Sequence, residues 1–387
     1  MTLRHRLAFL ALLGATVVAT TASAQIDPVS RELLELGYEQ PLQGHAPVGA
    51  YVFYYLNRPQ FRESDRTLRL SVSPVYLDGE LGIRDGLGSG TDIGIGFNGG
   101  GFAYDYDEIR SGHWFRDQSF SGHGAGVAVS IYHLFNPGKR VPLNGVLRGR
   151  VRYVAYERDS HNPETFTLPK DQPIASLRAG LRFGGIEPLL HPDVAGELSG
   201  WYEGQFRLDA GDYGFAGDRR VEPAVHMFWG RGLLVYTLPR SGHRFSLTAI
   251  AGGTVHPDRL SAYRIGGDLT LNSEFPLDLP GYYAGEFGAR NFVLVGGEYA
   301  VPLDAAREWH VGIGAASARI GYAPGLEQGR ASRSGASVEA EYRPASKLWK
   351  TALAYGHGFD AVRGNHHGAD SVTLSLEVDL RVLRYHQ

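Results

Sequence analysis

Residues 371–382 read Ser-Val-Thr-Leu-Ser-Leu-Glu-Val-Asp-Leu-Arg-Val, in which polar and aliphatic side chains alternate without a break. Because successive side chains of a β-strand point to opposite faces, one face carries six aliphatic residues and the other carries Glu377, Asp379 and Arg381. A tilted strand of this length spans the hydrocarbon core of a bilayer. The stretch therefore predicts a transmembrane barrel strand with lipid on one side and a polar lumen on the other.

The same alternation recurs in four other segments, at 147–156, 177–183, 197–208 and 337–343, and each places its charges on one face. We therefore expect an all-β protein, a transmembrane antiparallel β-barrel. A soluble β-sandwich or propeller also alternates polar and apolar residues and is the alternative. The N-terminus favours the barrel, because residues 1–24 have the charged start, apolar run and Ala22-Ser23-Ala24 cleavage site of a secretory signal peptide.

Composition narrows the class further. The 387 residues include 52 glycines and no cysteine, and the net charge is −3. Disulfides and thiolate sites are excluded, and no basic field suggests nucleic acid. No later segment has the roughly 18 uninterrupted apolar residues of a membrane-spanning helix. An exported chain of this kind is expected in the bacterial outer membrane, with outer-membrane lipid as its surroundings.

Residues 25–47 are expected to form a short N-terminal segment, and residues 48–387 the barrel. Within the first, Asp27-Pro28 and Gly37 have the types expected at the start and end of a small helix. Long polar segments at 105–118, 158–173 and 209–220 are expected to be extracellular loops. We predict about fourteen strands, with 12–16 possible, near 48–56, 67–77, 91–104, 119–135, 143–157, 174–187, 194–208, 221–238, 244–256, 291–303, 309–322, 333–344, 347–359 and 371–384.

Residues 264–303 carry a family pattern. They read Arg264-Ile-Gly266-Gly267, then Gly281-Tyr282 in a loop, then a strand containing Glu298-Tyr299-Ala300-Val301-Pro302. This resembles the BamA/TamA-like barrels of the outer-membrane assembly-factor superfamily (bacterial surface antigens), in which a Gly-Gly segment leads to a lumenal loop and five strands follow. The resemblance implies a long loop folded into the lumen. It also implies a role in protein insertion or translocation, with a client or periplasmic protein as partner.

Three features depart from that family. Pro280 stands where the family's loop carries arginine, 309–322 contains no aspartate, and 25–47 is too short for periplasmic POTRA repeats. The sequence thus predicts a POTRA-less member. Two functions from other classes stay open: a passive or selective solute pore, and an outer-membrane lipid-modifying enzyme.

No catalytic residue, cofactor or metal site is predicted, and we expect no enzyme. The Ser-Gly-His triplets at 111–113, 121–123 and 241–243 and the pair His366-His367 have the composition of turns. Charges on the non-lipid faces are expected to form a lumenal network that stiffens the wall or selects solutes. Its predicted members are Arg148, Arg150, Arg152, Arg178, Arg182, Glu298, Glu339, Glu341, Arg343, Glu377, Asp379 and Arg381.

Two contacts are predicted. Arg264 should meet an acid on a following strand, with Glu298, Glu339 and Glu377 as candidates, because a guanidinium inside a narrow barrel needs a partner. The first strand, expected near 48–56, should pair incompletely with 371–384 and leave a weak seam.

Overall fold

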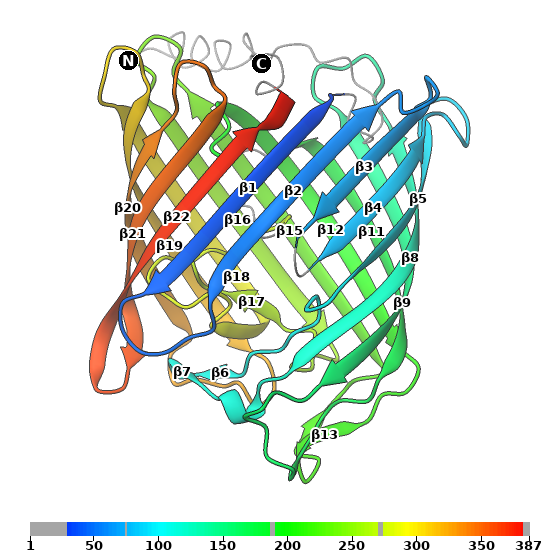
Figure 1. Cartoon of the computed structure of the whole chain (residues 1–387), viewed down its shortest axis with the longest axis vertical. Coiled ribbons are helices and arrows are strands. Elements are labelled where there is room, and N and C mark those ends of the chain that lie inside the picture. The colour runs from blue at the N-terminus through cyan, green and yellow to red at the C-terminus, as the bar shows by residue number, and fades with distance from the viewer. Residues whose placement is uncertain (1–28, 74–75, 186–189, 270–273, 382–387) are drawn as a thin grey trace, which may run out of the picture.

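The protein is described from a computed structural model, which places residues 29–73, 76–185, 190–269 and 274–381. Sixteen antiparallel strands form one closed barrel, in which each strand pairs with the next and the last, β22, pairs with β1. Figure 1 shows the tilted strands around a central lumen. The barrel strands are β1 (Arg31–Pro41), β2 (Gly49–Pro59), β3 (Arg66–Val72), β4 (Leu77–Ile83), β5 (Thr91–Gly100), β8 (Ser121–Leu134), β9 (Leu143–Glu157), β11 (Gln172–Gly185), β12 (Val194–Arg207), β15 (Ala224–Thr237), β16 (Arg244–Val255), β18 (Phe287–Pro302), β19 (Trp309–Tyr322), β20 (Ser332–Tyr342), β21 (Trp349–Arg363) and β22 (His366–Asp379).

The all-β barrel is confirmed, and the count of about fourteen is corrected to sixteen. The sequence missed β1 and β4. β4 has only seven residues, and its Gly79, Gly82 and acidic Asp78 and Glu80 resemble a turn more than a strand. None of the described residues forms a helix long and apolar enough to cross a membrane.

The small helix expected near residues 27–37 is wrong where the structure describes the chain. Residues 31–41 form β1, paired on both sides with β2 and β22. Leu33, Glu35, Gly37 and Glu39 alternate as its buried positions, so the strand period overrides the apparent helix caps. Asp27, Pro28 and the expected signal peptide lie outside the described residues.

The two faces of the wall differ as the alternation requires. On β11, Leu177 and Leu181 are exposed on the outer face, while Arg178 and Arg182, each the next residue along the chain, face inward and contact other polar groups. β22 repeats this arrangement, with Leu374 half-exposed and Thr373 and Ser375 buried. A closed barrel that is apolar outside and charged inside is suited to a lipid bilayer.

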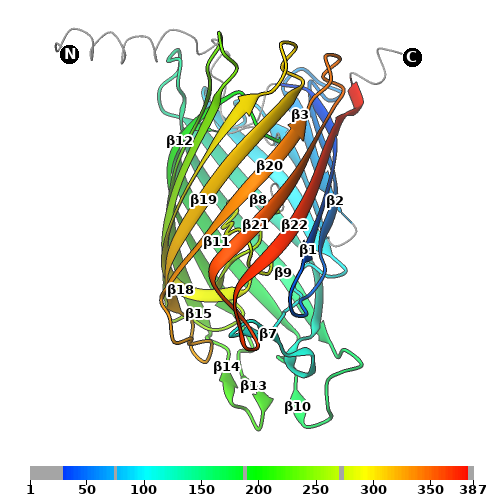
Figure 2. The ribbon, with the colours of Figure 1, turned by 90° about the vertical axis from the view of Figure 1, so that its left-hand side faces the viewer.

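The two ends of the barrel differ as well. β1 begins and β22 ends at the same end, which we call the short-turn end, while the connections carrying β10 (Phe166–Thr167), β13 (Asp212–Phe215) and β14 (Arg219–Arg220) extend from the opposite, long-loop end (Figure 2). The segments expected to be long loops, 105–118, 158–173 and 209–220, lie mainly in the connections of this end.

Those connections pack into a cap at the long-loop end. Their core is a hydrophobic cluster of five buried residues, the aromatic Tyr106, Phe120, Phe166 and Tyr213 together with Val221. The 101–120 connection adds β6 (Ile109–Arg110), β7 (His113–Trp114) and one 3₁₀ turn, η1 (Arg116–Gln118).

The cap also has a buried ionic centre at Glu108. Glu108 is fully buried and meets the guanidinium groups of Arg259 at 2.7 Å, Arg110 at 3.1 Å and Arg219 at 3.4 Å. Burial raises the pKa of Tyr106 to about 12, so its hydroxyl stays protonated and donates to Glu108. Because these groups come from three different connections, the cap is a packed lid and not a set of separate loops.

Candidate functional site

The connection between β16 and β18 is the longest excursion from the wall. It contains the short strand β17 (Tyr263–Ile265), which pairs with the start of β18, and then residues 266–286, which we call the inner loop. Gly266 and Gly267 have φ angles of 127° and 86°, a region that favours glycine. The loop is closed at its neck, because Leu279 N donates to Gly267 O at 2.7 Å and Gly285 N donates to Gly266 O at 3.1 Å.

The tip of the inner loop is anchored by Tyr282. Its side chain is fully buried, and its ring lies 5.2 Å from that of Phe287. The hydroxyl donates to Ser334 O at 3.1 Å on β20 and accepts from Asp360 N at 3.2 Å on β21. A residue of the predicted motif therefore fastens the loop to the wall strands β20 and β21.

Three inward glycines of β20 and β21 form a shelf for this tip. A Cβ atom added to Gly335 would lie 2.2 Å from Pro280 O. One added to Gly356 would lie 2.8 Å from Gly281 N, and one added to Gly358 would lie 2.8 Å from the Tyr282 ring. Gly281 (φ 81°) is equally confined, because its own Cβ would lie 2.0 Å from Gly358 N. These glycines are required for close backbone approach.

The other end of the inner loop contacts the opposite wall through Glu274. Its carboxylate meets Arg182 at 2.7 Å and Arg178 at 3.2 Å, both on β11. Arg231 of β15 donates to the Glu274 carbonyl at 2.8 Å. The predicted Arg178 and Arg182 thus hold the loop itself.

Phe275 adds an aromatic contact beside this ion cluster. Its ring lies 5.5 Å from Trp201 and 5.8 Å from Trp229, and the Arg231 guanidinium lies 4.6 Å from the same ring. Apolar packing and charge therefore fix the same two residues of the loop.

The remaining predicted arginines face the lumen beside this cluster. Arg148 pairs with Asp78 at 2.9 Å, and Arg150 pairs with Glu203 at 3.4 Å. Arg152 has its guanidinium 5.0 Å from the Tyr104 ring, and no ion pair joins it to an acid in the described part of the chain. Arg148 and Arg150 are therefore paired with acids of β4 and β12 and not with the acids of the C-terminal strands.

Those C-terminal acids have their own cation, Arg244 of β16. It meets Glu341 at 2.6 Å and Glu298 at 3.1 Å, and lies 4.0 Å from Glu339. Glu339 also lies 3.2 Å from the Nε2 atom of His191, in the turn between β11 and β12.

The last predicted members lie at the short-turn end. Glu377 accepts from Leu190 N at 2.6 Å, and Arg343 lies 3.6 Å from Asp193, so both meet the β11–β12 turn. Asp379 accepts from the backbone N of Arg381 at 2.9 Å.

The structure assigns Arg264 a different partner from the predicted one. It does not meet Glu298, Glu339 or Glu377; its Nη1 donates to Asp107 O at 3.3 Å, and the guanidinium lies 4.8 Å from the Tyr106 ring. The reason is its place on β17, which extends the wall at the long-loop end and brings Arg264 under the cap.

The expected seam is also corrected. Residues 48–56 belong to the second strand, and β1 pairs with β22 through nine consecutive residue pairs, from Leu33–Asp379 to Pro41–Ser371. One of these pairs sets Glu35 directly opposite Glu377. Glu35 is 1% exposed, and neither of its carboxylate oxygens has a hydrogen-bond partner among the described residues. The seam is closed, but two carboxyl groups face each other inside it.

Several site residues were absent from the sequence prediction. Asp78, Glu203, Arg244 and Glu274 each complete an ion pair described above. Glu203 is an inward position of 197–208, where the alternation was already visible. Glu274 lies in a loop without any period, so no sequence pattern identifies it.

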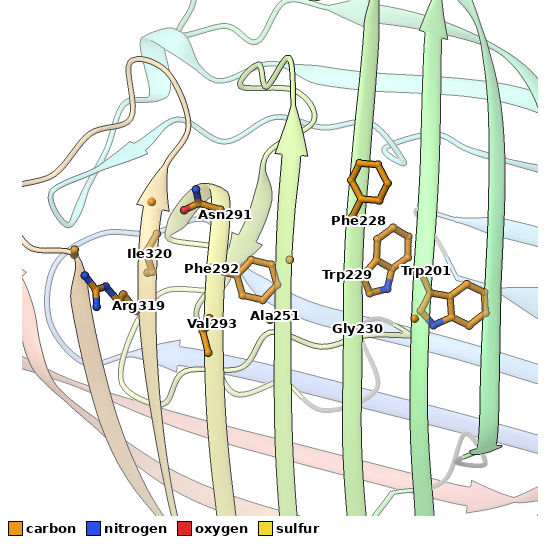
Figure 3. Close-up of a pocket in the computed structure, with 14 residues that line it drawn as sticks. Trp201, Phe228, Trp229, Gly230, Ala251, Asn291, Phe292, Val293, Arg319 and Ile320 are labelled. Atoms are coloured by element: carbon orange, nitrogen blue, oxygen red, sulfur yellow. The ribbon is translucent and has the colours of Figure 1, made fainter.

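A shallow hollow of about 880 Å³ lies on the wall between β12 and β19 (Figure 3). Among its lining residues, Phe228 and Val293 point outward and are about half-exposed. Most of the other lining residues are glycine, alanine or apolar, with Asn291 and Arg319 as the polar ones. The outward side chains Phe228 and Val293 place its opening on the outer face, while Trp201 and Trp229, which also line it, contact Phe275 of the inner loop.

No protein-family model and no curated protein matches the chain. Solved structures match its fold. CdiB from Acinetobacter baumannii gives a TM-score of 0.58 at 10% identity, covering 90% of this chain and 60% of that one. CdiB from Escherichia coli gives 0.56 at 12%, covering 91% and 63%. BamA from Haemophilus ducreyi lacking POTRA domains 1–3 gives 0.54 at 10%, covering 90% and 70%. The chain spans about three fifths of the first of these, and the likeness is one of fold, that of outer-membrane β-barrels.

Proposed function

We propose that this chain is an outer-membrane barrel that assists the insertion or translocation of polypeptides, with a lumen closed by its inner loop. The observation that carries the proposal is the docking of that loop on two walls. Its tip lies on β20 and β21, and Glu274 lies on β11. β11 and β21 are seven strands apart in a ring of sixteen, so a loop that reaches both crosses the lumen.

The loop's place in the chain supports the same proposal. It follows the eleventh barrel strand, β16, and exactly five barrel strands follow it, as in the assembly-factor barrels that the 264–303 motif resembles. The Gly281-Tyr282 pair of that motif forms the docked tip. The arginine that the family carries before this glycine is Pro280 here, and its carbonyl rests against Gly335.

The cap argues against a general diffusion pore. Barrels of this class have short periplasmic turns and longer extracellular connections, so we assign the long-loop end to the cell exterior. The buried cluster around Glu108 and Phe120 then lies across the external mouth. A solute would have to pass both this lid and the inner loop.

The β1–β22 seam is the place where we expect a polypeptide to engage. Glu35 faces Glu377 there and is buried without a hydrogen-bond partner among the described residues, and a buried polar group without a partner costs folding free energy. A strand edge released at this seam offers unpaired backbone groups that can template an incoming strand.

The assay is insertion of an unfolded outer-membrane β-barrel protein into liposomes with and without this protein. We expect faster insertion in its presence and small, rare single-channel currents in planar bilayers. Equal insertion rates together with large, steady currents would overturn the proposal.

That second result would favour the alternative, a solute pore. One observation supports a pore. The inward face of β9 carries Arg148, Arg150 and Arg152, and the Arg152 guanidinium has no acid partner in the described chain. A pore of this kind would prefer anions.

A further inference from the structure

Two glutamates of the predicted lumenal charge network and one histidine that the sequence did not single out converge inside the barrel. They are His191 from the β11–β12 turn, Glu298 from β18 and Glu339 from β20. One ligand atom of each, an imidazole nitrogen or a carboxylate oxygen, lies within 4.8 Å of those of the other two. The three come from segments far apart in the chain, so the closed barrel creates the cluster.

The His191 imidazole is aimed at this cluster without a hydrogen bond of its own. Its side chain is 10% exposed, and Nε2 lies 3.2 Å from Glu339 Oε1. Nε2 is nevertheless a buried nitrogen that makes no hydrogen bond to any described group. A buried polar atom without a hydrogen-bond partner costs folding free energy. A metal ion that accepts the lone pair of this nitrogen would remove that cost.

The turn is held so that His191 keeps this position. Leu190 N donates to Glu377 at 2.6 Å, and Lys350 Nζ donates to His191 O at 3.1 Å. His191 itself has φ 48°, a left-handed backbone conformation. The ligand is therefore preorganised by contacts to β21 and β22.

Acids outnumber cations around the cluster. Glu298, Glu339 and Glu341 share the single guanidinium of Arg244. Asp268 of the inner loop interacts electrostatically with Glu298, Glu339 and His191. A divalent cation would offset this local negative charge.

We propose that His191, Glu298 and Glu339 bind a divalent transition metal, with Zn²⁺ as the leading candidate. Imidazole nitrogen and carboxylate oxygens are ligands that Zn²⁺ takes in proteins, at about 2.0–2.2 Å. The metal would join the β11–β12 turn to β18 and β20, and so stabilise the folded barrel when bound.

The test exploits the absence of cysteine from the chain. The protein is purified in detergent and stripped with EDTA. One sample is titrated with Co²⁺, and in a separate sample loaded with Zn²⁺ the bound zinc is measured by mass spectrometry. We expect one metal per chain and visible cobalt absorption bands. In His191→Cys, the new thiolate should add a near-ultraviolet sulfur-to-cobalt charge-transfer band, which no other residue can produce.

Further variants separate ligand loss from misfolding. His191→Ala and the double variant Glu298→Gln/Glu339→Gln should lose stoichiometric binding, while His243→Ala, whose ring bonds Tyr299 on the outer face, should keep it. Folding is checked by the difference in electrophoretic mobility between unheated and heated samples. A folded His191→Cys without the charge-transfer band, or a folded His191→Ala that binds metal as wild type does, would overturn the site.

Discussion

Replacing Tyr282 with alanine should undock the inner loop. The wild-type ring is fully buried against Phe287, and its hydroxyl holds Ser334 O and Asp360 N. Truncating a buried aromatic residue costs about 3–5 kcal/mol. At about 1.4 kcal/mol per tenfold, the docked state should lose a factor of roughly 140 to 3,700 against the undocked state.

The assay is single-channel recording in planar bilayers. Wild-type protein should conduct rarely, and Tyr282→Ala should open far more often. Tyr282→Phe keeps the ring but removes both hydrogen bonds of the hydroxyl, so its opening frequency should lie between the two. Tyr38→Ala is the control, because Tyr38 is 45% exposed on the outer face. If Tyr282→Ala folds and its currents match those of wild type, the loop does not close the lumen and the reasoning fails.

Three other perturbations follow from the same contacts. Gly335→Ala should undock the tip and raise conductance, since its Cβ would lie 2.2 Å from Pro280 O, whereas Gly200→Ala, with nothing within 4 Å, should leave conductance unchanged. Arg219→Ala leaves the buried Glu108 with Arg110 and Arg259 as its remaining cations, should weaken the cap, and should make the 101–120 connection sensitive to limited proteolysis; a resistant cap would contradict this. Glu35→Gln replaces a buried carboxyl group that has no hydrogen-bond partner among the described residues with an amide that can donate to Glu377, so the barrel should resist unfolding in detergent at higher temperature than wild type, and an equal or lower temperature would show that the pair does not weaken the seam.

The alternation of charged and apolar residues was enough to predict the barrel, because one period sets both faces of every long strand. β22 illustrates this, since Thr373 and Ser375 are buried inward and Leu374 is exposed outward. The two missed strands lacked that signal. β4 is seven residues long, and β1 begins close to Asp27-Pro28 and contains Gly37, which together resemble helix caps.

The site was predictable only in part. The glycines and Tyr282 of the 264–303 motif could be picked out as loop residues from the sequence. The partners of the charged residues could not be predicted from the sequence, because they depend on which strands face each other across the lumen and on where a loop ends. Arg264 pairs with the cap, and Arg178 pairs with Glu274 of the inner loop, although no sequence period relates either pair.

Locking the seam tests whether the closed barrel acts on polypeptides through its first and last strands. Leu36 and Leu376 are directly opposite across β1 and β22, so Leu36→Cys/Leu376→Cys can be oxidised to a disulfide in a chain that has no other cysteine. Leu353→Cys/Leu374→Cys locks β22 to its other neighbour, β21, as the matched control.

The measurement is the rate at which an unfolded outer-membrane barrel protein inserts into liposomes that contain each variant, oxidised and then reduced. We predict that oxidation of the Leu36–Leu376 pair abolishes the acceleration, that reduction restores it, and that the control pair accelerates insertion in both states. Equal acceleration by the oxidised and reduced seam variant would contradict the account.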